Sequence, residues 1–355
     1  MAEFLFEDVE IAISKQAETA LNTNYTSIAD FQRVLVAQPV VPIPTPDKAS
    51  DAGRVGNGHE FITPGRLCNT YWQQPSITIE DDIDFDMSGK LFRRALGSVV
   101  TGATIGSFIG KSFKLLPKAS GLQLPSSDII ARLGGADFLH AGMVVQSYRM
   151  FQQGNDRPKY SATLLGTGKY VNPSPAGTLT VPTYVCPSGN NILIQWTDSG
   201  GVRDLTGSGC NISGWSVDVA TELRDKRCAG DPTTGPAGCT SSWAAYRRAL
   251  TRKKRTISAT ITYKLDSTLP EWTQMVCNEL ITDVIIRVGA NAAGLLATDI
   301  MQEATIPKAY LSAIQITDDD GDAAQQITIT PAWDATSGTA IAGRVINADA
   351  AGSWT

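Results

Sequence analysis

The chain has 355 residues, which is enough to bury a full hydrophobic core in one large domain or two smaller ones. Its net charge of −5 argues against tight nucleic-acid binding by the whole chain, because proteins that grip phosphates normally carry an excess of Lys and Arg. Apolar residues make up 42% and charged residues only 18%, which favours a surface that is partly buried in an assembly.

No feature of the sequence indicates secretion or membrane insertion. Acidic residues follow residues 1–6 at once, so we expect no secretory signal. The longest apolar runs are far too short for a membrane helix. The six cysteines contain no C-x-x-C pair, which excludes zinc-ribbon spacing and favours free thiols. A disulfide between Cys228 and Cys239 stays open as an alternative.

The N-terminal part predicts short helices followed by an arm. Residues 7–22 carry apolar side chains at helical spacing, and a second short helix is expected to begin at Ser27 as its N-cap. The prolines of residues 39–58 favour extended polyproline geometry, and the Gly/Asn run after them is typical of a loop. We interpret residues 1–60 as an N-terminal helical element with a Pro/Gly-rich arm.

Period-2 alternation dominates from residue 61 onward and predicts strands. Residues 76–86 alternate Ile and Phe with acidic side chains, and residues 256–266 alternate apolar side chains with Thr and Ser. Further strands are predicted at 143–150, 160–166, 191–196, 214–221, 283–289, 310–316 and 325–333. Such alternation is typical of antiparallel sheets with one wet face.

One helix is predicted among these strands, over residues 270–282. Pro270 suits its first turn, and four apolar side chains share one face: Trp272, Met275, Val276 and Leu280. Strands flanked by one helix indicate a mainly β, antiparallel sandwich or barrel. We expect it to span residues 61–355, either as one unit or as two duplicated halves, about 61–185 and 186–355.

Two short motifs resemble catalytic or phosphate-binding loops, and each has a simpler explanation. The stretch 197–201 resembles the nucleophile loop of chymotrypsin-like serine proteases, with Ser199 as nucleophile and His59 upstream. It departs from that pattern at Thr197, and a hairpin turn explains it better. The stretch 106–112 has one residue too few between its glycines to wrap a phosphate, so we expect a surface or interface loop.

The remaining acidic and histidine motifs predict no metal site. Residues 318–322 resemble a calcium loop, but the Gly is misplaced, and a turn between two strands is expected instead. Only two histidines exist, His59 and His140, in unrelated contexts. We therefore expect no catalytic residue, no metal site and no cofactor.

Two charged clusters are the candidate interaction surfaces. The acidic strand face could line a lumen, meet the basic cluster of another copy or face solvent; it comprises Glu80, Asp82, Asp84 and Asp86. The basic cluster could bind nucleic acid, form ion pairs between subunits or face solvent; it comprises Arg247, Arg248, Arg252, Lys253, Lys254 and Arg255.

The order of elements from about residue 60 resembles that of bacteriophage tail-tube (major tail) proteins of long-tailed phages. The resemblance rests on the acidic strand SITIEDDIDFD, the segment KLFRRALGSV, the strand pairs that follow it, the helix PEWTQMVCNELIT and a closing hairpin with an Asp/Gly turn. It covers about four-fifths of the chain as a pattern.

This resemblance implies a structural virion protein without catalytic activity. Six copies, or three if each chain holds two barrel-like halves, would form a ring, and rings would stack into a hollow tail tube through which DNA passes during genome ejection. Its partners would be further copies, the tail terminator, the tape-measure protein and distal tail proteins, assembled in the host cytoplasm without a membrane. Residues 1–60 and the 222–246 loop would bridge rings. The alternatives are a terminator, neck or decoration protein, a serine protease, or a nucleic-acid-binding β protein.

Overall fold

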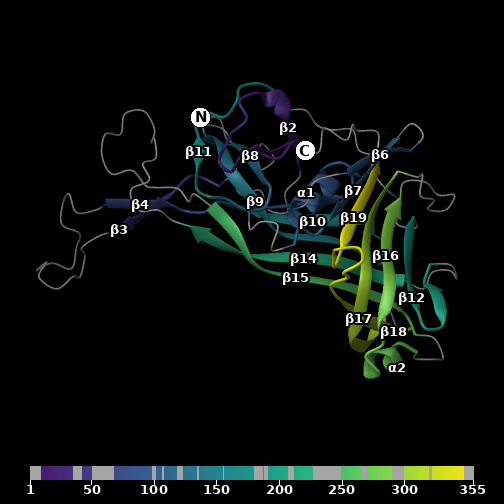
Figure 1. Ribbon diagram of the computed structural model, residues 1–355. Coiled ribbons are helices and arrows are strands. Elements are labelled where there is room, and N and C mark those ends of the chain that lie inside the picture. Colours follow the sequence, from purple (N-terminus) through teal and green to yellow (C-terminus); the bar gives the residue numbers. More distant parts are fainter. Residues whose placement is uncertain are drawn as a thin grey trace, which may run out of the picture.

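The computed structural model is an almost all-β molecule with two α-helices among its described residues (Figure 1). It describes residues 9–34, 42–49, 68–97, 101–105, 108–117, 123–133, 136–154, 156–179, 187, 191–206, 212–226, 249–265, 270–289, 300–319 and 322–347. Seventeen strands belong to one hydrogen-bonded sheet, and every pairing within it is antiparallel. The predicted mainly β, antiparallel fold is therefore confirmed.

Six neighbouring strands form the main part of this sheet. In hydrogen-bonded order they are β5 (Ser76–Asp82), β10 (Lys159–Leu165), β9 (Ala136–Gln153), β14 (Ile212–Lys226), β15 (Ala249–Lys264) and β18 (Asp322–Pro331). Figure 1 shows β14 and β15 side by side across the molecule. The strands predicted for these residues are confirmed, although β9 and β15 each begin seven residues earlier than predicted.

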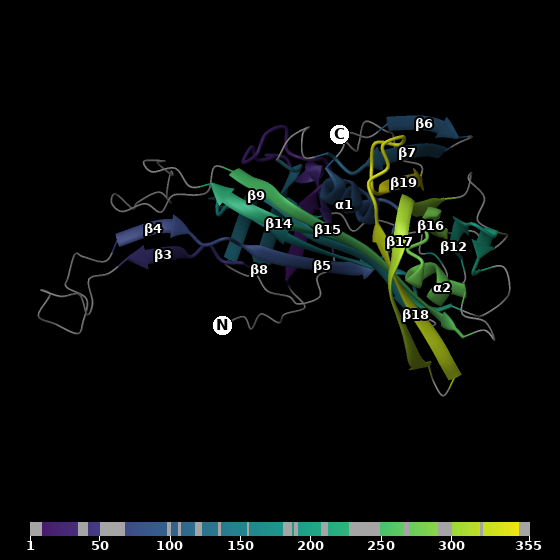
Figure 2. The same ribbon diagram turned by 60° about the horizontal axis from the view of Figure 1, so that its bottom comes forward.

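The second part of the sheet begins at β17 (Met301–Asp319), a long strand that pairs with strands of both parts. Its C-terminal half pairs with β18, and its N-terminal half lies between β16 (Ile281–Gly289) and β19 (Ala342–Asn347). The outer strands are β12 (Ile192–Asp198) and β13 (Gly201–Asp204) beyond β16, and β7 (Phe108–Lys114) and β6 (Thr101–Ile105) beyond β19. In Figures 1 and 2 this part crosses the main part at a steep angle.

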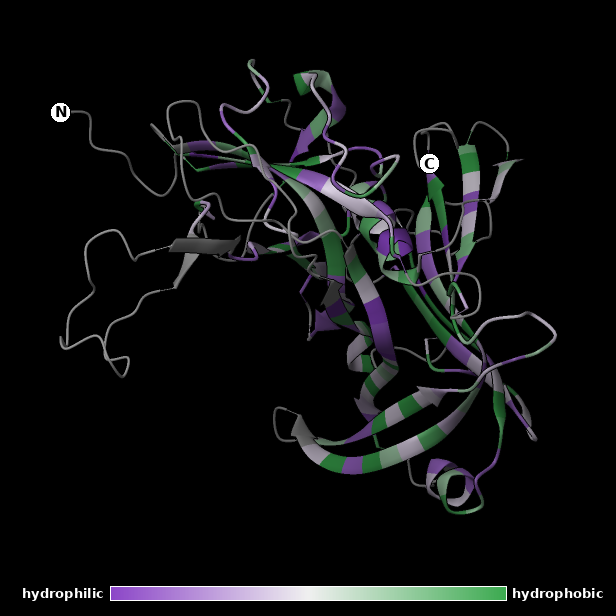
Figure 3. Ribbon diagram, turned by 60° about the vertical axis from the view of Figure 1, so that its left-hand side comes forward, coloured by the Kyte–Doolittle hydropathy of each residue, from purple (hydrophilic) through white to green (hydrophobic). Residues whose placement is uncertain are grey.

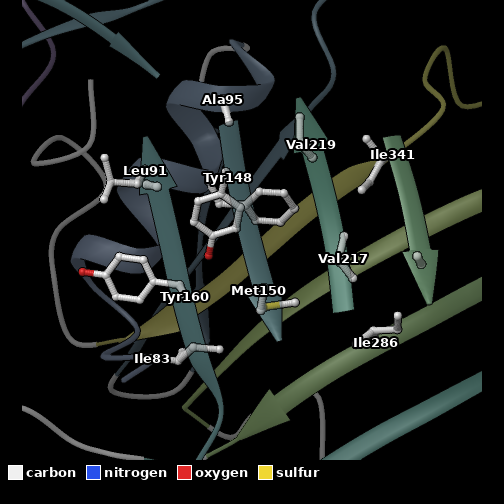
Figure 4. Packing of buried hydrophobic residues seen from close by; sticks show 14 of the residues in the cluster. Ile83, Leu91, Ala95, Tyr148, Met150, Tyr160, Val217, Val219, Ile286 and Ile341 are labelled. Carbon is white, nitrogen blue, oxygen red and sulfur yellow. The ribbon is translucent and has the colours of Figure 1, made fainter. Parts of the chain in front are cut away.

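Helix α1 (Met87–Leu96) contacts both parts of the sheet, through β9 and β14 and through β7 and β19. All ten of its residues are buried. Its Phe92 ring stacks on Tyr148 with centroids 5.0 Å apart, and Tyr148 stacks on Tyr160 at 6.3 Å. Figure 4 shows Tyr148, Tyr160 and Leu91 of this core. The main core runs from Ile11 to Val345, so both halves of the chain contribute to it.

The helix predicted over residues 7–22 is wrong, because a strand forms there. β1 (Glu10–Ser14) lies between β2 (Phe31–Arg33) and β8 (Ser126–Leu133), and Ile11 to Ser14 are all buried. A short apolar run that is buried on both faces fits the spacing of a helix as well as that of a strand, and here the pairing with β2 and β8 makes it a strand. Ser27 is an N-cap as predicted, but its helix is a single 3-10 turn, η2 (Ile28–Asp30).

The proline-rich region enters a ribbon of two strands, β3 (Pro46–Ala49) and β4 (Cys68–Trp72). These strands pair only with each other among the described strands. Figures 1 and 2 show the ribbon pointing away from the rest of the molecule. The boundary expected at residue 60 falls between its strands, outside the described residues. The last small strand, β11 (Tyr170–Val171), pairs with β9.

Helix α2 (Pro270–Val276) confirms the flanking helix predicted from Pro270, although it is shorter than expected. It packs near β17 at the end of the molecule opposite the ribbon (Figures 1 and 2).

Candidate assembly surfaces

The main part of the sheet has one apolar face, which belongs to the core, and one polar face. Figure 3 shows the alternation of apolar and polar residues along the strands. The polar face is defined by the side chains that alternate with core residues: Thr78 and Glu80 on β5, Ser161 and Thr163 on β10, Ser147, Arg149 and the one aromatic, Phe151, on β9, Ser216 and Asp218 on β14, Lys254, Thr256, Ser258, Thr260 and Thr262 on β15, and Gln326 and Thr328 on β18. Hydroxyl groups therefore dominate this face.

The charges on the polar face are partly paired across strands. The Arg149 guanidinium Nε lies 3.3 Å from a carboxylate oxygen of Asp218 on the neighbouring strand. The hydroxyl groups of Thr78 and Thr163 lie 3.1 Å apart. Paired charges and hydroxyl groups give a hydrated surface with little net positive potential.

The four acidic candidates divide into two pairs. Glu80 and Asp82 lie on β5, which pairs only with β10 among the described strands and so forms an edge of the sheet. Asp84 instead lies three residues before α1, where its carboxylate accepts hydrogen bonds from the backbone N–H groups of residues 86–88, at 2.9 to 3.2 Å. Asp86 forms an ion pair with Lys90, 2.6 Å apart. A carboxylate at a helix N-terminus stabilises the helix.

The basic cluster divides in a similar way. Arg247 and Arg248 lie outside the described residues. Arg252 and Arg255 turn inward, where their guanidinium groups donate to the backbone carbonyls of Leu96, Leu116 and Pro117. Leu96 is the last residue of α1, and residues 116–117 follow β7.

Lys253 and Lys254 are the exposed members of the cluster. The Lys253 ammonium lies 2.6 Å from Glu222 on the neighbouring strand. Lys254 shares the face of Thr256 and Ser258, so it belongs to the polar face. Residues 252–258 of β15 pair only with β14 among the described strands, because β18 joins β15 from residue 259 onward. Glu80 and Lys254 therefore lie on one face of one sheet, near two separate open edges.

The loop that resembles a protease nucleophile loop is a tight hairpin turn. Asp198 pairs with Gly201, which leaves Ser199 and Gly200 as the two turn residues between β12 and β13. The Asp198 carboxylate accepts from the Gly200 N–H at 2.8 Å and from the Gln274 side chain at 2.7 Å. The expected hairpin turn is confirmed, and the Asp198 carboxylate is engaged in holding α2.

Of the two histidines, only His140 is described, and it is engaged elsewhere in the fold. His59 lies outside the described residues. His140 is buried on β9, where burial lowers its pKa to about 4, and its Nε2 lies 2.6 Å from the carbonyl of Pro42. The neutral imidazole therefore donates to the chain segment that leads into the β3–β4 ribbon.

The other motifs have structural roles in the part of the chain that is described. Asp319 ends β17 and pairs with Asp322, the first residue of β18, and residues 320–321 of the expected turn lie outside the described residues. Of the motif 106–112, the described residues 108–112 lie on β7, which pairs with β6, and Lys111 is buried and donates to the Asn347 side chain. No three His, Cys, Asp or Glu side chains are grouped closely enough to hold a metal ion in the described ranges. No helix described there is long and apolar enough to span a membrane.

Sequence reasoning missed the orientation of α2. Trp272 and Val276 face outward and are 55% and 56% exposed, whereas Met275 packs against the main core and Glu271 and Gln274 are buried. Glu271 forms an ion pair with Arg203 of β13, whose guanidinium also lies over the Trp196 ring. Glu271, Gln274 and Met275 thus anchor the helix, and Trp272 and Val276 are presented to solvent.

Comparison with known proteins gives a family match and a weak structural similarity. A family model described as "Phage tail tube protein" matches residues 72–335. The solved structures include a similar chain from the "Virion of native gene transfer agent (GTA) particle", at 13% identity and a TM-score of 0.26, covering 41% of this chain and 93% of that one. No curated protein matches.

Proposed function

Because this chain belongs to the family of phage tail tube proteins, a structural component of the virion tail, we propose that its copies close into rings that stack into a hollow tube. The family match over most of the chain is the observation that carries this proposal. Six copies per ring is the number that the resemblance implies. The tube would carry DNA during genome ejection, and its function would be mechanical and electrostatic.

The polar face of the main sheet is the surface best suited to line the channel. Basic contacts that release counterions would hold DNA in place, so a conduit needs a hydrated face without an excess of positive charge. Hydroxyl groups cover much of this face, and Arg149 is paired with Asp218. The opposite face is buried against α1 and is not available to a channel.

Neighbouring copies within a ring would meet at the two open edges of this sheet. Edge strands present unpaired backbone groups and readily pair with another chain. One edge carries Glu80 and Asp82, and the other carries Lys254. Opposite charges at two different edges favour a head-to-tail contact, which closes into a ring when the rotation allows it.

The other partners follow from the place of such a tube in a virion. A stack of rings grows until a partner stops it, so we propose contacts with a tail terminator, a tape-measure protein and distal tail proteins. Assembly would take place in the host cytoplasm. Residues 1–60 and the 222–246 loop were expected to connect successive rings, but β1 and β2 belong to the sheet and residues 222–226 extend β14. We therefore propose this role for the Pro/Gly-rich arm of residues 39–58 and for residues 227–246.

Negative-stain electron microscopy of the purified full-length chain tests the proposal. We expect hollow rings or tubes of uniform width, and subunit counting in end views gives the number of copies. A chain that stays monomeric at high concentration, even when tail extracts supply nucleating partners, would contradict it.

A further inference from the structure

The outward face of α2 is an apolar surface that nothing in the described chain covers. Trp272 and Val276 are separated by one helical turn and therefore share a face. Ile281 pairs with Ala309, so Leu280 and Tyr310 are neighbours just beyond that pair. They are 39% and 41% exposed. Since α2 contacts β17, we call these four exposed apolar side chains on and beside them the aromatic surface.

The helix cannot rotate to bury this surface, because its other side is anchored. Glu271 is fully buried and paired with Arg203, and Gln274 donates to Asp198 at 2.7 Å. Turning Trp272 inward would expose or unpair both groups. Burying an unpaired carboxylate is costly, so the outward orientation is fixed by the fold.

The β3–β4 ribbon and the segment that leads into it are the part of the described chain that a contact with another molecule would stabilise. An isolated two-stranded ribbon is marginally stable in water, and β3 and β4 pair only with each other among the described strands. The segment that enters the ribbon is Pro42-Ile43-Pro44-Thr45-Pro46, in which Ile43 is 60% exposed. Its base is held at the body by the contact between His140 and the Pro42 carbonyl.

We infer that the proline-rich segment 42–46 of one copy docks on the aromatic surface of a neighbouring copy, an inference that rests on the proposed self-assembly. Proline-rich extended segments bind aromatic-lined surfaces because their conformation is already ordered before binding. Ile43 adds an exposed apolar side chain to this contact. Trp and Tyr supply large apolar areas with few rotatable bonds.

The positions of the two surfaces require the partner to be a second copy. Figures 1 and 2 show the ribbon and α2 at opposite ends of the molecule, so one chain does not bring them together. Two different surfaces at opposite ends make a head-to-tail contact, which can repeat from copy to copy. This contact is separate from the sheet edges that carry Glu80 and Lys254.

A crosslinking experiment tests this contact in the full-length protein. Cys277 is exposed and follows Val276 directly, so it reports on the aromatic surface. We expect Ile43→Cys to form an intermolecular adduct with Cys277 under a short bismaleimide reagent. Adding Cys277→Ser is the matched control and should remove that adduct. In parallel, Trp272→Ala should weaken assembly at least about tenfold in sedimentation, as expected for a buried Trp anchor. Ile316→Ala, another exposed apolar side chain on β17, should leave assembly near wild type.

The outcomes separate this inference from the proposed function. The Trp272→Ala and Ile316→Ala variants should both keep the unfolding midpoint of the wild type, since both side chains are exposed. Tubes that form normally with Trp272→Ala, together with an adduct that is absent or independent of Cys277, would overturn the inference and leave the tube intact. Wild-type protein that never assembles would overturn both.

Discussion

The Arg255 guanidinium of β15 donates to the backbone carbonyl of Leu96, the last residue of α1, at 3.0 Å. The same group reaches the Leu116 carbonyl at 3.4 Å. Burial, and the charge of Arg252 nearby, lower the pKa of Arg255 to about 10, so it stays charged at neutral pH. A cation at a helix C-terminus is stabilised by the helix dipole. The strand that carries the basic cluster therefore also holds the core helix in place.

Replacing Arg255 should destabilise the monomer. Arg255→Met removes charge-assisted hydrogen bonds to buried carbonyls, so we expect a loss of about 1–3 kcal/mol in the free energy of unfolding. Urea denaturation of the unassembled protein measures it. The matched control is Lys254→Met on the same strand, which should change stability by less than about 0.5 kcal/mol. Equal effects of the two substitutions would contradict the inward role of Arg255.

Arg203→Ala should be among the most damaging substitutions of a partly exposed residue. It leaves the Glu271 carboxylate fully buried without its cation, which costs roughly 3–5 kcal/mol when a buried pair is broken. Arg157→Ala is the control, because its pair with Asp82 is exposed and should contribute about 0–1 kcal/mol. Thermal unfolding of the two variants compares them; a small effect of Arg203→Ala would show that α2 is anchored otherwise.

Stability should fall at alkaline pH because of Asp128. This buried carboxyl accepts from the Tyr25 N–H at 2.6 Å, and burial and the nearby Glu18 raise its pKa well above 3.8. The folded state therefore keeps a proton that the unfolded state has released. The stability from this group is complete below pH 3.8 and is lost progressively as pH rises toward the folded pKa.

Asp128→Asn tests this pH dependence, because the amide stays neutral. In the unassembled protein, we expect the urea midpoint of unfolding of the variant to rise relative to that of the wild type between pH 6 and pH 9. Asp137→Asn is a control, since its carboxylate is partly exposed and paired with Arg132. Parallel pH profiles of wild type and Asp128→Asn would show that Asp128 is ionised throughout this range.

Charge reversal should identify the contact between sheet edges. Glu80→Lys and Lys254→Glu each place like charges at the proposed interface, so each variant alone should assemble poorly. A mixture of the two should co-assemble, because every contact then joins Lys to Glu. Sedimentation and electron microscopy measure this. Failure of the mixture, with both variants folded, would contradict an interface between these edges.

The sequence predicted much of this fold, and it did so best where one face of a strand is wet. Thr alternates with Ile along 256–266, which reveals both the strand and its buried face. The run Ile11 to Ser14 is buried on both sides of β1 and has no such alternation, so its helical spacing was misleading. Partners such as β8, more than a hundred residues away, decide its conformation.

The sequence contains local signals for the start and end of helix α1, but the strand-like alternation of residues 76–86 hid the start of the helix. Asp84 lies three residues before the helix and caps it, and Gly97 ends it in the left-handed conformation with φ 82°. The apolar residues Ile83, Phe85 and Met87 continue the every-second-residue spacing of the strand up to the first residue of the helix, so the spacing gives no sign of where the strand ends. In α2 the apolar stripe was recognised, but its exposure depends on the partners of Glu271, which only the tertiary structure reveals.

A cryo-electron microscopy reconstruction of the assembled protein tests the central claim most directly. We predict a hollow tube whose channel is lined by the polar face, with Thr163, Arg149 and Ser258 turned toward its axis. A solid particle, a discrete oligomer without a channel, or a tube that carries these three side chains on its outer surface would contradict the account.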